Sequence, residues 1–290
     1  MINWDVPKRY LRMTLYRGDK NAGVMNKLTE EVGVKLNTSE SVSGALNEAN
    51  ITINGLLVEN MFYLATSTTQ WIQNWIQNRI VINAGYYGQS GIIFDGVVFS
   101  AKPNLERADY GITLKCMSMF SDLTENKSYS FAGQIPVSQI AQKLAADMGL
   151  KFVDEVKDDS IVINNYTLRD QNAVNGLRLL SQMTGLDIYS SGNRVYMKKR
   201  GESISSARAN TITTQDIIGV PEPTDTGVII NVRLNPGIRT GQAVFVDSLK
   251  YPQLKSYKFF LSTLSHVADT RGRDWYTRLN LTKEGLGWYQ

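Results

Sequence analysis

Much of the chain alternates apolar and polar side chains at every second residue, which is the pattern of β-strands with one buried face. In the first 125 residues this alternation runs through positions 11–15, 32–36 and 51–53, and a further strand is expected at 110–119. Successive side chains of a strand point to opposite faces. One face of each strand is therefore expected to pack on a core, and the other to meet solvent or a partner.

The longest of these patterns, residues 78–101, predicts a β-hairpin. Apolar residues alternate with other residues through 80–84, a turn-rich stretch follows at 85–91, and apolar residues return at 93–99. A glycine-rich turn between two strand patterns is typical of a hairpin. Hairpins this long often extend past their barrel, so this one is a candidate for contact with a neighbouring subunit.

Residues 71–78 break the alternation. The tetrapeptide Trp-Ile-Gln-Asn occurs twice in succession, which places Trp71 beside Trp75 on one side of a short helix. We favour a helix that covers the core by plugging one end of a barrel. An exposed aromatic binding patch is the alternative.

The middle of the chain changes to helical spacing. Apolar residues recur at this spacing over 137–148 and 173–183, and Gly149 and Gly185 follow where a helix commonly ends. Each glycine is followed by leucine and a strand pattern, and the second strand is expected to turn back in a hairpin over 186–197. The two similar helix–glycine–strand segments predict a pseudo-repeated α+β module.

Residues 201–227 are rich in Ser, Thr, Asp and Pro and are expected to form a linker or an exposed loop. Strand alternation returns from Val228, is interrupted by an Asn-Pro-Gly turn at 235–237, and reappears at 275–281.

These patterns together predict a mainly β fold with an α+β insert. We expect two similar antiparallel β-barrels to flank the small α+β module. The expected units are a first β-barrel at 1–125 that contains the hairpin 78–101, the α+β insert at 126–204, and a second β-barrel at 205–290.

Composition narrows the chemistry that this chain can perform. Its 290 residues include 31 Lys and Arg against 27 Asp and Glu, a net charge of +4. A single cysteine, Cys116, excludes an internal disulfide framework and a zinc site built on several thiolates. A single histidine, His266, excludes a multi-histidine metal cluster. No signal peptide, membrane span or stable membrane insertion is expected.

The residues that could carry catalysis or ligand binding each favour a structural interpretation. His266 lies where a strand runs into a turn, and Cys116 lies inside an apolar strand. The acidic run at 154–159 lacks the ligand spacing of a calcium loop and is interpreted as solvated. The basic cluster at 198–200 is too short for a nucleic-acid surface. No phosphate-binding glycine motif occurs, so no catalytic residue, cofactor or metal is predicted.

Three segments, taken in order, resemble hub proteins of the tail baseplates of contractile-tailed bacteriophages, especially the Mu-like and gene-D-like hubs. They are the hairpin at 83–98, the stretch 219–234, and the ending 264–271 with 275–277. The α+β module is similar to the domain that such hubs carry between their barrels. Ala268 stands where a glycine is expected before Asp-Thr, and because the chain stops at Gln290 we expect no fused lysozyme or spike domain.

The resemblance implies a structural protein of the virion, assembled in the host cytoplasm. It implies a homotrimeric ring with pseudo-sixfold symmetry that starts the tail tube, holds the central spike on one side and receives tube subunits on the other. Other baseplate proteins and the tape measure protein are further expected partners. Two alternatives remain open at this point: a peptidoglycan hydrolase with an undetected carboxylate pair, and a carbohydrate- or nucleic-acid-binding β module.

Overall fold

The computed structural model describes residues 7–18, 23–29, 31–43, 46–69, 76–105, 110–118 and 126–286. The fold is mainly β with a small α+β insert, as the sequence predicts. A 13-stranded sheet runs through both ends of the described chain, and two small sheets form the insert. No helix in these ranges is long and apolar enough to cross a membrane.

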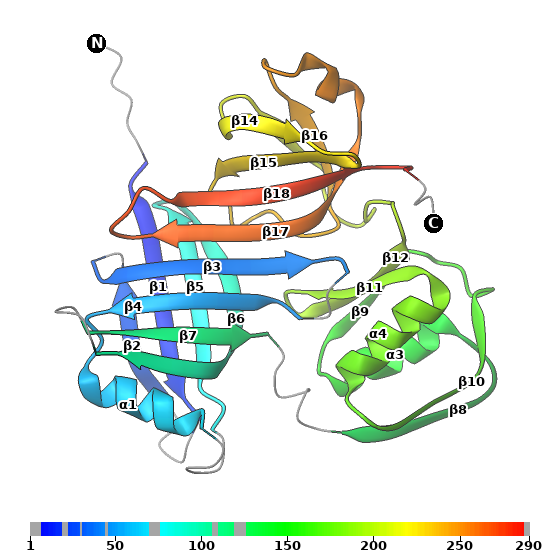
Figure 1. Ribbon diagram of the computed structural model, residues 1–290. Coiled ribbons are helices and arrows are strands. Elements are labelled where there is room, and N and C mark those ends of the chain that lie inside the picture. Colours follow the sequence, from blue (N-terminus) through cyan, green and yellow to red (C-terminus); the bar gives the residue numbers. More distant parts are fainter. Residues whose placement is uncertain are drawn as a thin grey trace.

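The N-terminal part of the large sheet curls around one hydrophobic core. Strands β3, β4 and β7 cross in front of β1 and β5 in Figure 1, and the pairing order is β3-β4-β7-β6-β5-β1-β2. The core consists of the alternate, inward-facing residues of these strands, as the two-residue periodicity predicts. The elements are β1 (Arg9–Arg17), β2 (Gly23–Thr29), β3 (Gly33–Ser41), β4 (Glu48–Asn54), α1 (Val58–Ser67), β5 (Arg79–Tyr86), β6 (Gln89–Asn104) and β7 (Gly111–Met117).

The helix that covers this core is α1, which the sequence analysis did not predict. Its Met61 and Leu64 are fully buried in the core of the N-terminal sheet. The predicted helix at 71–78 lies mostly outside the described residues, and residues 76–78, which are described, form no helix.

The predicted hairpin is present as β5 and β6, joined at Tyr87 and Gly88. It does not stand clear of the sheet, because β1 pairs with β5 up to Tyr86. The strand β6 changes partner along its length. Its first half pairs with β5 as far as Val97, and its second half pairs with β7.

The insert contains the same strand–helix–strand order twice, which accounts for the similar sequence segments. The first copy is β8, α3 and β9, and the second is β10, α4 and β11. Strands β8 and β10 pair with each other, while β9 and β11 flank β12. Gly149 and Gly185 follow the helices with φ of 68° each, as predicted. The elements are β8 (Lys127–Pro136), α3 (Val137–Asp147), β9 (Lys151–Asp154), β10 (Val162–Gln171), α4 (Ala173–Thr184), β11 (Leu186–Ser191) and β12 (Arg194–Lys199).

The C-terminal part continues the large sheet around a core of its own. The expected linker at 201–227 is wrong in part, because it contains β13 and β14. Pro221 and Pro223 fit in β14 since this strand lies at the end of the sheet and pairs only with β15 among the described strands. The elements are β13 (Asn210–Thr213), β14 (Ile217–Pro223), β15 (Gly227–Arg233), β16 (Ala243–Asp247), η1 (Pro252–Ser256), β17 (Phe259–Asp269) and β18 (Trp275–Lys283).

One strand pair joins the two parts of the large sheet. The strand β17 pairs with β16 through Phe259 and Phe260, and then with β3 from Thr263 to Asp269. In Figure 1 the strands β15, β18, β17, β3 and β4 follow one another across the front of the molecule. The N-terminal and C-terminal parts therefore share an unbroken backbone hydrogen-bonding ladder.

Candidate functional site

The joint between the two parts of the sheet brings together several segments that the sequence analysis singled out. The indole nitrogen of Trp275 in β18 donates a hydrogen bond to the carbonyl oxygen of Gly85 at the hairpin tip, at 3.0 Å. Both atoms are buried. The hairpin tip is thus held within its own chain, against the C-terminal part of the sheet.

Arg9 of β1 binds the turn between β17 and β18 at the same contact between the two parts of the sheet. The Arg9 guanidinium donates hydrogen bonds to the carbonyl oxygens of Gly272 at 2.8 Å and Arg273 at 2.9 Å. It also lies over the ring of Trp275, 5.3 Å from the centroid. Ala268, where the resemblance led us to expect glycine, is an ordinary buried strand residue paired with Trp275. No glycine conformation is needed there.

His266 is a buried packing residue of β17 and is only 2% exposed. Its Nδ1 is 2.9 Å from the Thr277 hydroxyl, and its backbone N–H donates to the Thr38 hydroxyl at 3.2 Å. Burial, with a smaller contribution from Arg239, lowers the pKa of His266 to about 3. The imidazole is therefore neutral at pH 7 and already engaged with Thr277, which is not the arrangement of an accessible general base.

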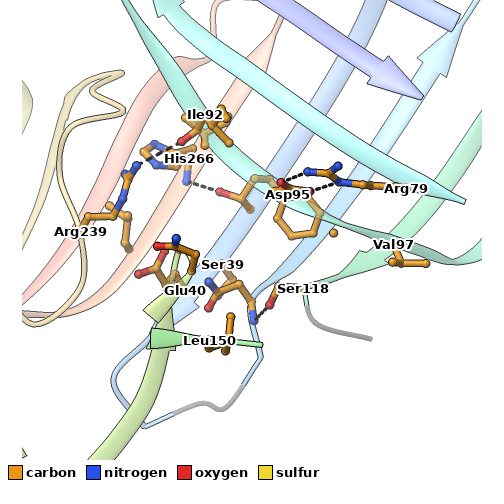
Figure 2. Close-up of a pocket in the computed structure, with 18 of the residues that line it drawn as sticks. Ser39, Glu40, Arg79, Ile92, Asp95, Val97, Ser118, Leu150, Arg239 and His266 are labelled. Carbon is orange, nitrogen blue, oxygen red and sulfur yellow. Dashed lines mark hydrogen bonds and ion pairs between the residues drawn. The ribbon is translucent and has the colours of Figure 1, made fainter. Parts of the chain in front are cut away.

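A cavity of about 710 Å³ lies beside this histidine, between β3, β6 and the turn after β11 in the insert. Figure 2 shows Arg239, Glu40 and His266 on one side of it and the Arg79–Asp95 ion pair on the other. Arg79 and Asp95 form two hydrogen bonds, at 2.8 and 2.6 Å. The cavity is thus lined by charged groups that already have ion-pair or hydrogen-bond partners, and by apolar side chains.

Arg239 and Glu40 connect segments that are far apart in the sequence, and the sequence analysis did not find them. Arg239 donates hydrogen bonds to the carbonyl oxygens of Pro236 and, on β6, of Ile92. Glu40 accepts a hydrogen bond from the Thr240 hydroxyl. Both side chains hold the loop that follows β15 against the N-terminal part of the sheet. No local motif marks them.

The basic cluster supplies a buried ion pair inside the insert, between β11 and β12, where the insert meets β17. Lys198 is 1% exposed, and its Nζ lies 2.6 Å from Asp187 Oδ2 and 4.6 Å from the centroid of the Phe260 ring in β17. Burial lowers the pKa of Lys198, and the nearby Asp187 opposes that shift. Arg200 lies 3.5 Å from the other oxygen of Asp187. The cluster at 198–200 is therefore partly buried and does not form a basic stripe.

The acidic residues at 154–159 accept hydrogen bonds from different partners and do not converge. Asp154 caps the backbone of residues 156 and 157, and Asp158 binds Ser160. Asp159 binds Ser138, and Glu155 accepts from Ser205 and Ser206 in the segment that leads to β13. Within the described part of the chain, no three metal-ligating side chains gather at one place.

Cys116 lies in the core of the N-terminal sheet, and burial raises the pKa of its thiol. A neutral thiol buried in a core is unreactive.

None of the candidate residues above forms a reactive site among the described residues. Sheet edges and exposed apolar side chains are the remaining features suited to function. Such edges and side chains are used for association between protein chains.

Comparison of the sequence with known families gives a match over almost the whole chain. The sequence model of a family described as baseplate hub gp41 matches residues 10–281. No curated protein matches the sequence.

Solved structures with a similar fold come from phage tails and a secretion system. The 43 kDa tail protein of prophage MuSo2 from Shewanella oneidensis has a TM-score of 0.60 at 10% identity, covering 94% of this chain and 98% of its own. The tail protein from Neisseria meningitidis MC58 has a TM-score of 0.61 at 13% identity, covering 95% and 97%. The Escherichia coli c3393 protein, a type VI secretion component similar to the T4 tail proteins gp27 and gp5, has a TM-score of 0.62 at 11% identity, covering 94% and 77%.

Proposed function

The chain belongs to the baseplate hub gp41 family and is a structural component of a phage tail baseplate, and we propose that three copies form a closed ring around the tail axis. In this ring the central spike is bound on one side and the first tail-tube subunits on the other. The ring starts the tail tube of a contractile injection system. Other baseplate proteins and the tape measure protein are further partners.

One observation carries this proposal: two β regions of one chain are joined edge to edge into one sheet through β3 and β17. Each chain thereby supplies two neighbouring segments of the wall of the proposed ring. Three chains supply six such segments, so one ring can fit a threefold spike on one side and a sixfold tube on the other. Closed cyclic symmetry is the usual solution for a repeated subunit.

The division into units at 1–125, 126–204 and 205–290 is part of the proposal. Three large hydrophobic cores support it, one centred on each region, and a small fourth cluster of Val42, Tyr189 and Phe260 lies where the regions meet. The core of the N-terminal region also takes in Ala268 and Trp275, so the two β regions act as one body at their joint. The insert lies beside the sheet in Figure 1 and leaves the front strands uncovered.

We assign no catalytic, cofactor or metal site to this protein. The support is the neutral, hydrogen-bonded His266 and the buried Cys116. The chain acts in the virion and assembles in the host cytoplasm.

Native mass measurement of the purified chain and of tails that contain it tests the ring. Three copies per ring are expected. A dimer, a hexamer of this chain, or a chain that stays monomeric at every concentration contradicts the proposal. Incubation with peptidoglycan tests the enzyme alternative, because robust clearing by the wild-type chain would favour a hydrolase and contradict the structural role.

A further inference from the structure

A cleft distinct from the cavity beside His266 lies between the insert and the large sheet. Its volume is about 490 Å³, and its walls come from α4, β11 and the residue after β12 in the insert, from the end of β3 and the residues that follow, and from β17 and β18. The insert lies beside the end of β3 in Figure 1. Both β regions and the insert therefore contribute to this cleft.

Helix α4 presents a free guanidinium to the cleft. The helix buries Val174, Leu177 and Leu180 in the core of the insert. Arg178 and Gln182 are four residues apart, so they lie on the same side of the helix, and both are exposed lining residues of the cleft. Among the described residues Arg178 has no hydrogen-bond or ion-pair partner. Its positive charge is therefore uncompensated within the described part of the chain.

Arg200 brings a second guanidinium to the same cleft. Its Nε lies 3.5 Å from Oδ1 of Asp187, which is long for a charge-assisted hydrogen bond, and its side chain is 46% exposed. The other carboxylate oxygen of Asp187 lies 2.6 Å from Nζ of the buried Lys198. A guanidinium has five N–H donors. Arg200 therefore keeps donors for a further acceptor.

The charges that line the cleft do not balance. Asp187 is the only acidic residue among the described residues that line it, and Arg178 and Arg200 are the basic ones. Together with the buried Lys198, three cations share one carboxylate. The cavity beside His266 differs, because its charged groups already have partners. An excess of positive charge in a concave site favours a negatively charged occupant.

Uncharged donors complete the cleft. The side-chain amides of Gln182 and Asn280 line it, and no described residue accepts a hydrogen bond from them. The hydroxyls of Ser41 and Ser43 share one hydrogen bond of 2.9 Å, which leaves one of the two hydroxyl protons for another acceptor. An ionised carboxylate accepts hydrogen bonds and donates none. Guanidinium, amide and hydroxyl donors around one cleft therefore suit carboxylates.

Apolar side chains favour a peptide over a free anion. Val42 and Phe260 line the cleft and are buried, and Met183, beside Gln182 on α4, is 62% exposed. An inorganic anion would leave Met183 in water, whereas a peptide covers it while its acidic side chains reach the arginines. Nucleic acid requires a longer basic stripe than two exposed cations supply.

We propose that this cleft binds a segment of another baseplate protein that carries two neighbouring acidic side chains. One carboxylate pairs with Arg178 and the other with Arg200, and the rest of the segment covers the apolar side chains. This assignment rests on the proposed association with other baseplate proteins and gives that association a site. Because both β regions and the insert line the cleft, the bound segment contacts all three.

Binding of a labelled peptide to the full-length chain tests the site. The probe is a hexapeptide of alternating aspartate and leucine, and its control replaces each aspartate by asparagine. The acidic peptide is expected to bind and the control peptide not, and the affinity is expected to fall as salt is added. Absence of binding, or equal binding of the two peptides, overturns the assignment.

Substitutions locate the bound peptide. Arg178→Gln and Arg200→Gln are each expected to weaken binding about tenfold, because each removes charge-assisted hydrogen bonds. Arg12→Gln is the matched control, since Arg12 is exposed on β1 and does not line the cleft. Urea midpoints equal to that of the wild type exclude misfolding as the cause. An equal loss of affinity in all three variants means attraction to the overall charge and overturns the site.

Competition distinguishes the class of ligand. Inorganic phosphate and a single-stranded DNA oligonucleotide, each at the concentration of the peptide, are expected to displace little of it. Full displacement by phosphate means a simple anion site, and full displacement by the oligonucleotide means a nucleic-acid site, and either result overturns the assignment.

Assembled tails test the partner. Tails that carry Arg178→Glu/Arg200→Glu are expected to keep three copies of this chain and to lose one other baseplate protein. Tails of unchanged composition overturn the assignment of the partner. A wild-type chain that never forms a ring contradicts the proposed ring and leaves the peptide result standing, so the two failures are distinct.

Discussion

The indole nitrogen of Trp275 and the carbonyl oxygen of Gly85 lie 3.0 Å apart, although 190 residues separate them in the chain. This buried hydrogen bond ties the hairpin tip to the C-terminal part of the sheet. A buried carbonyl that loses its donor costs free energy.

Trp275→Phe is accordingly expected to lower the free energy of unfolding by about 1–3 kcal/mol. Urea denaturation measures the change. Tyr276→Phe, at the next position on the opposite face of β18, serves as the control and should change stability by about 0.5 kcal/mol or less. Equal stability of Trp275→Phe and the wild type would show that the hairpin tip is held by other contacts.

The buried His266 predicts a specific dependence of stability on pH. Its folded pKa of about 3 lies below the ordinary value, so the unfolded chain binds an additional proton between pH 6.5 and pH 3. Stability is therefore present above pH 6.5 and is lost as the pH falls. Between pH 7 and pH 5 this histidine should cost the fold about 2 kcal/mol.

The His266→Gln variant cannot titrate in this range and isolates the effect. Its free energy of unfolding should fall less than that of the wild type between pH 7 and pH 5, as measured by urea titration at each pH. Identical pH profiles for the two proteins would mean that His266 takes up a proton in the folded chain as readily as in the unfolded chain.

The buried pair Lys198–Asp187 predicts strong energetic coupling between β11 and β12 of the insert. Removing one partner of a buried ion pair leaves an uncompensated charge, so Asp187→Leu should cost about 3–5 kcal/mol. The double variant Asp187→Leu/Lys198→Met should recover most of that loss. Thermal unfolding of the three variants measures the coupling.

An exposed pair provides the matched control. Lys255 and Asp247 lie 2.8 Å apart with both side chains largely exposed. Asp247→Asn should therefore change stability by about 1 kcal/mol or less. If the buried and exposed pairs give equal losses, the Lys198 site is hydrated in solution.

Gly241 predicts a steric limit at the contact between the insert and the C-terminal part. It has φ of 80°, and a Cβ atom there would overlap the hydroxyl of Tyr189. Gly219 has nearly the same φ, 82°, with open space around it. Gly219→Ala should cost about 1–2 kcal/mol from backbone strain alone.

Gly241→Ala should cost about 1–3 kcal/mol more than Gly219→Ala, because the side chain also displaces Tyr189. Denaturant midpoints of the two variants give the comparison directly. Equal losses would show that Tyr189 moves freely and that the contact tolerates a methyl group.

Local sequence was sufficient for the elements whose identity depends on neighbouring residues. The alternation in β1, β3, β4, β15 and β18 and the helical spacing in α3 and α4 reflect which side chains face a core. The helix-ending glycines were equally readable, because a left-handed residue at that place favours glycine. The family followed from the order of several such segments.

Other elements were not readable from local sequence. The edge strand β14 contains two prolines and an irregular register, so its composition resembles that of a loop. Helix α1 was missed, since its helical pattern is short and stands between strand patterns. The hairpin tip was expected to reach outward, but the partners that hold it come from Arg9 and Trp275 at the two ends of the chain.

What the sequence determined by itself was therefore periodicity: which faces are apolar, where helices end, and the order of strands along the chain. Only the tertiary structure decided which strands are neighbours, because pairing between β3 and β17 depends on backbone groups more than 200 residues apart. Backbone hydrogen bonds are the same for every side chain, so no local pattern of residues specifies which distant strand will be the partner.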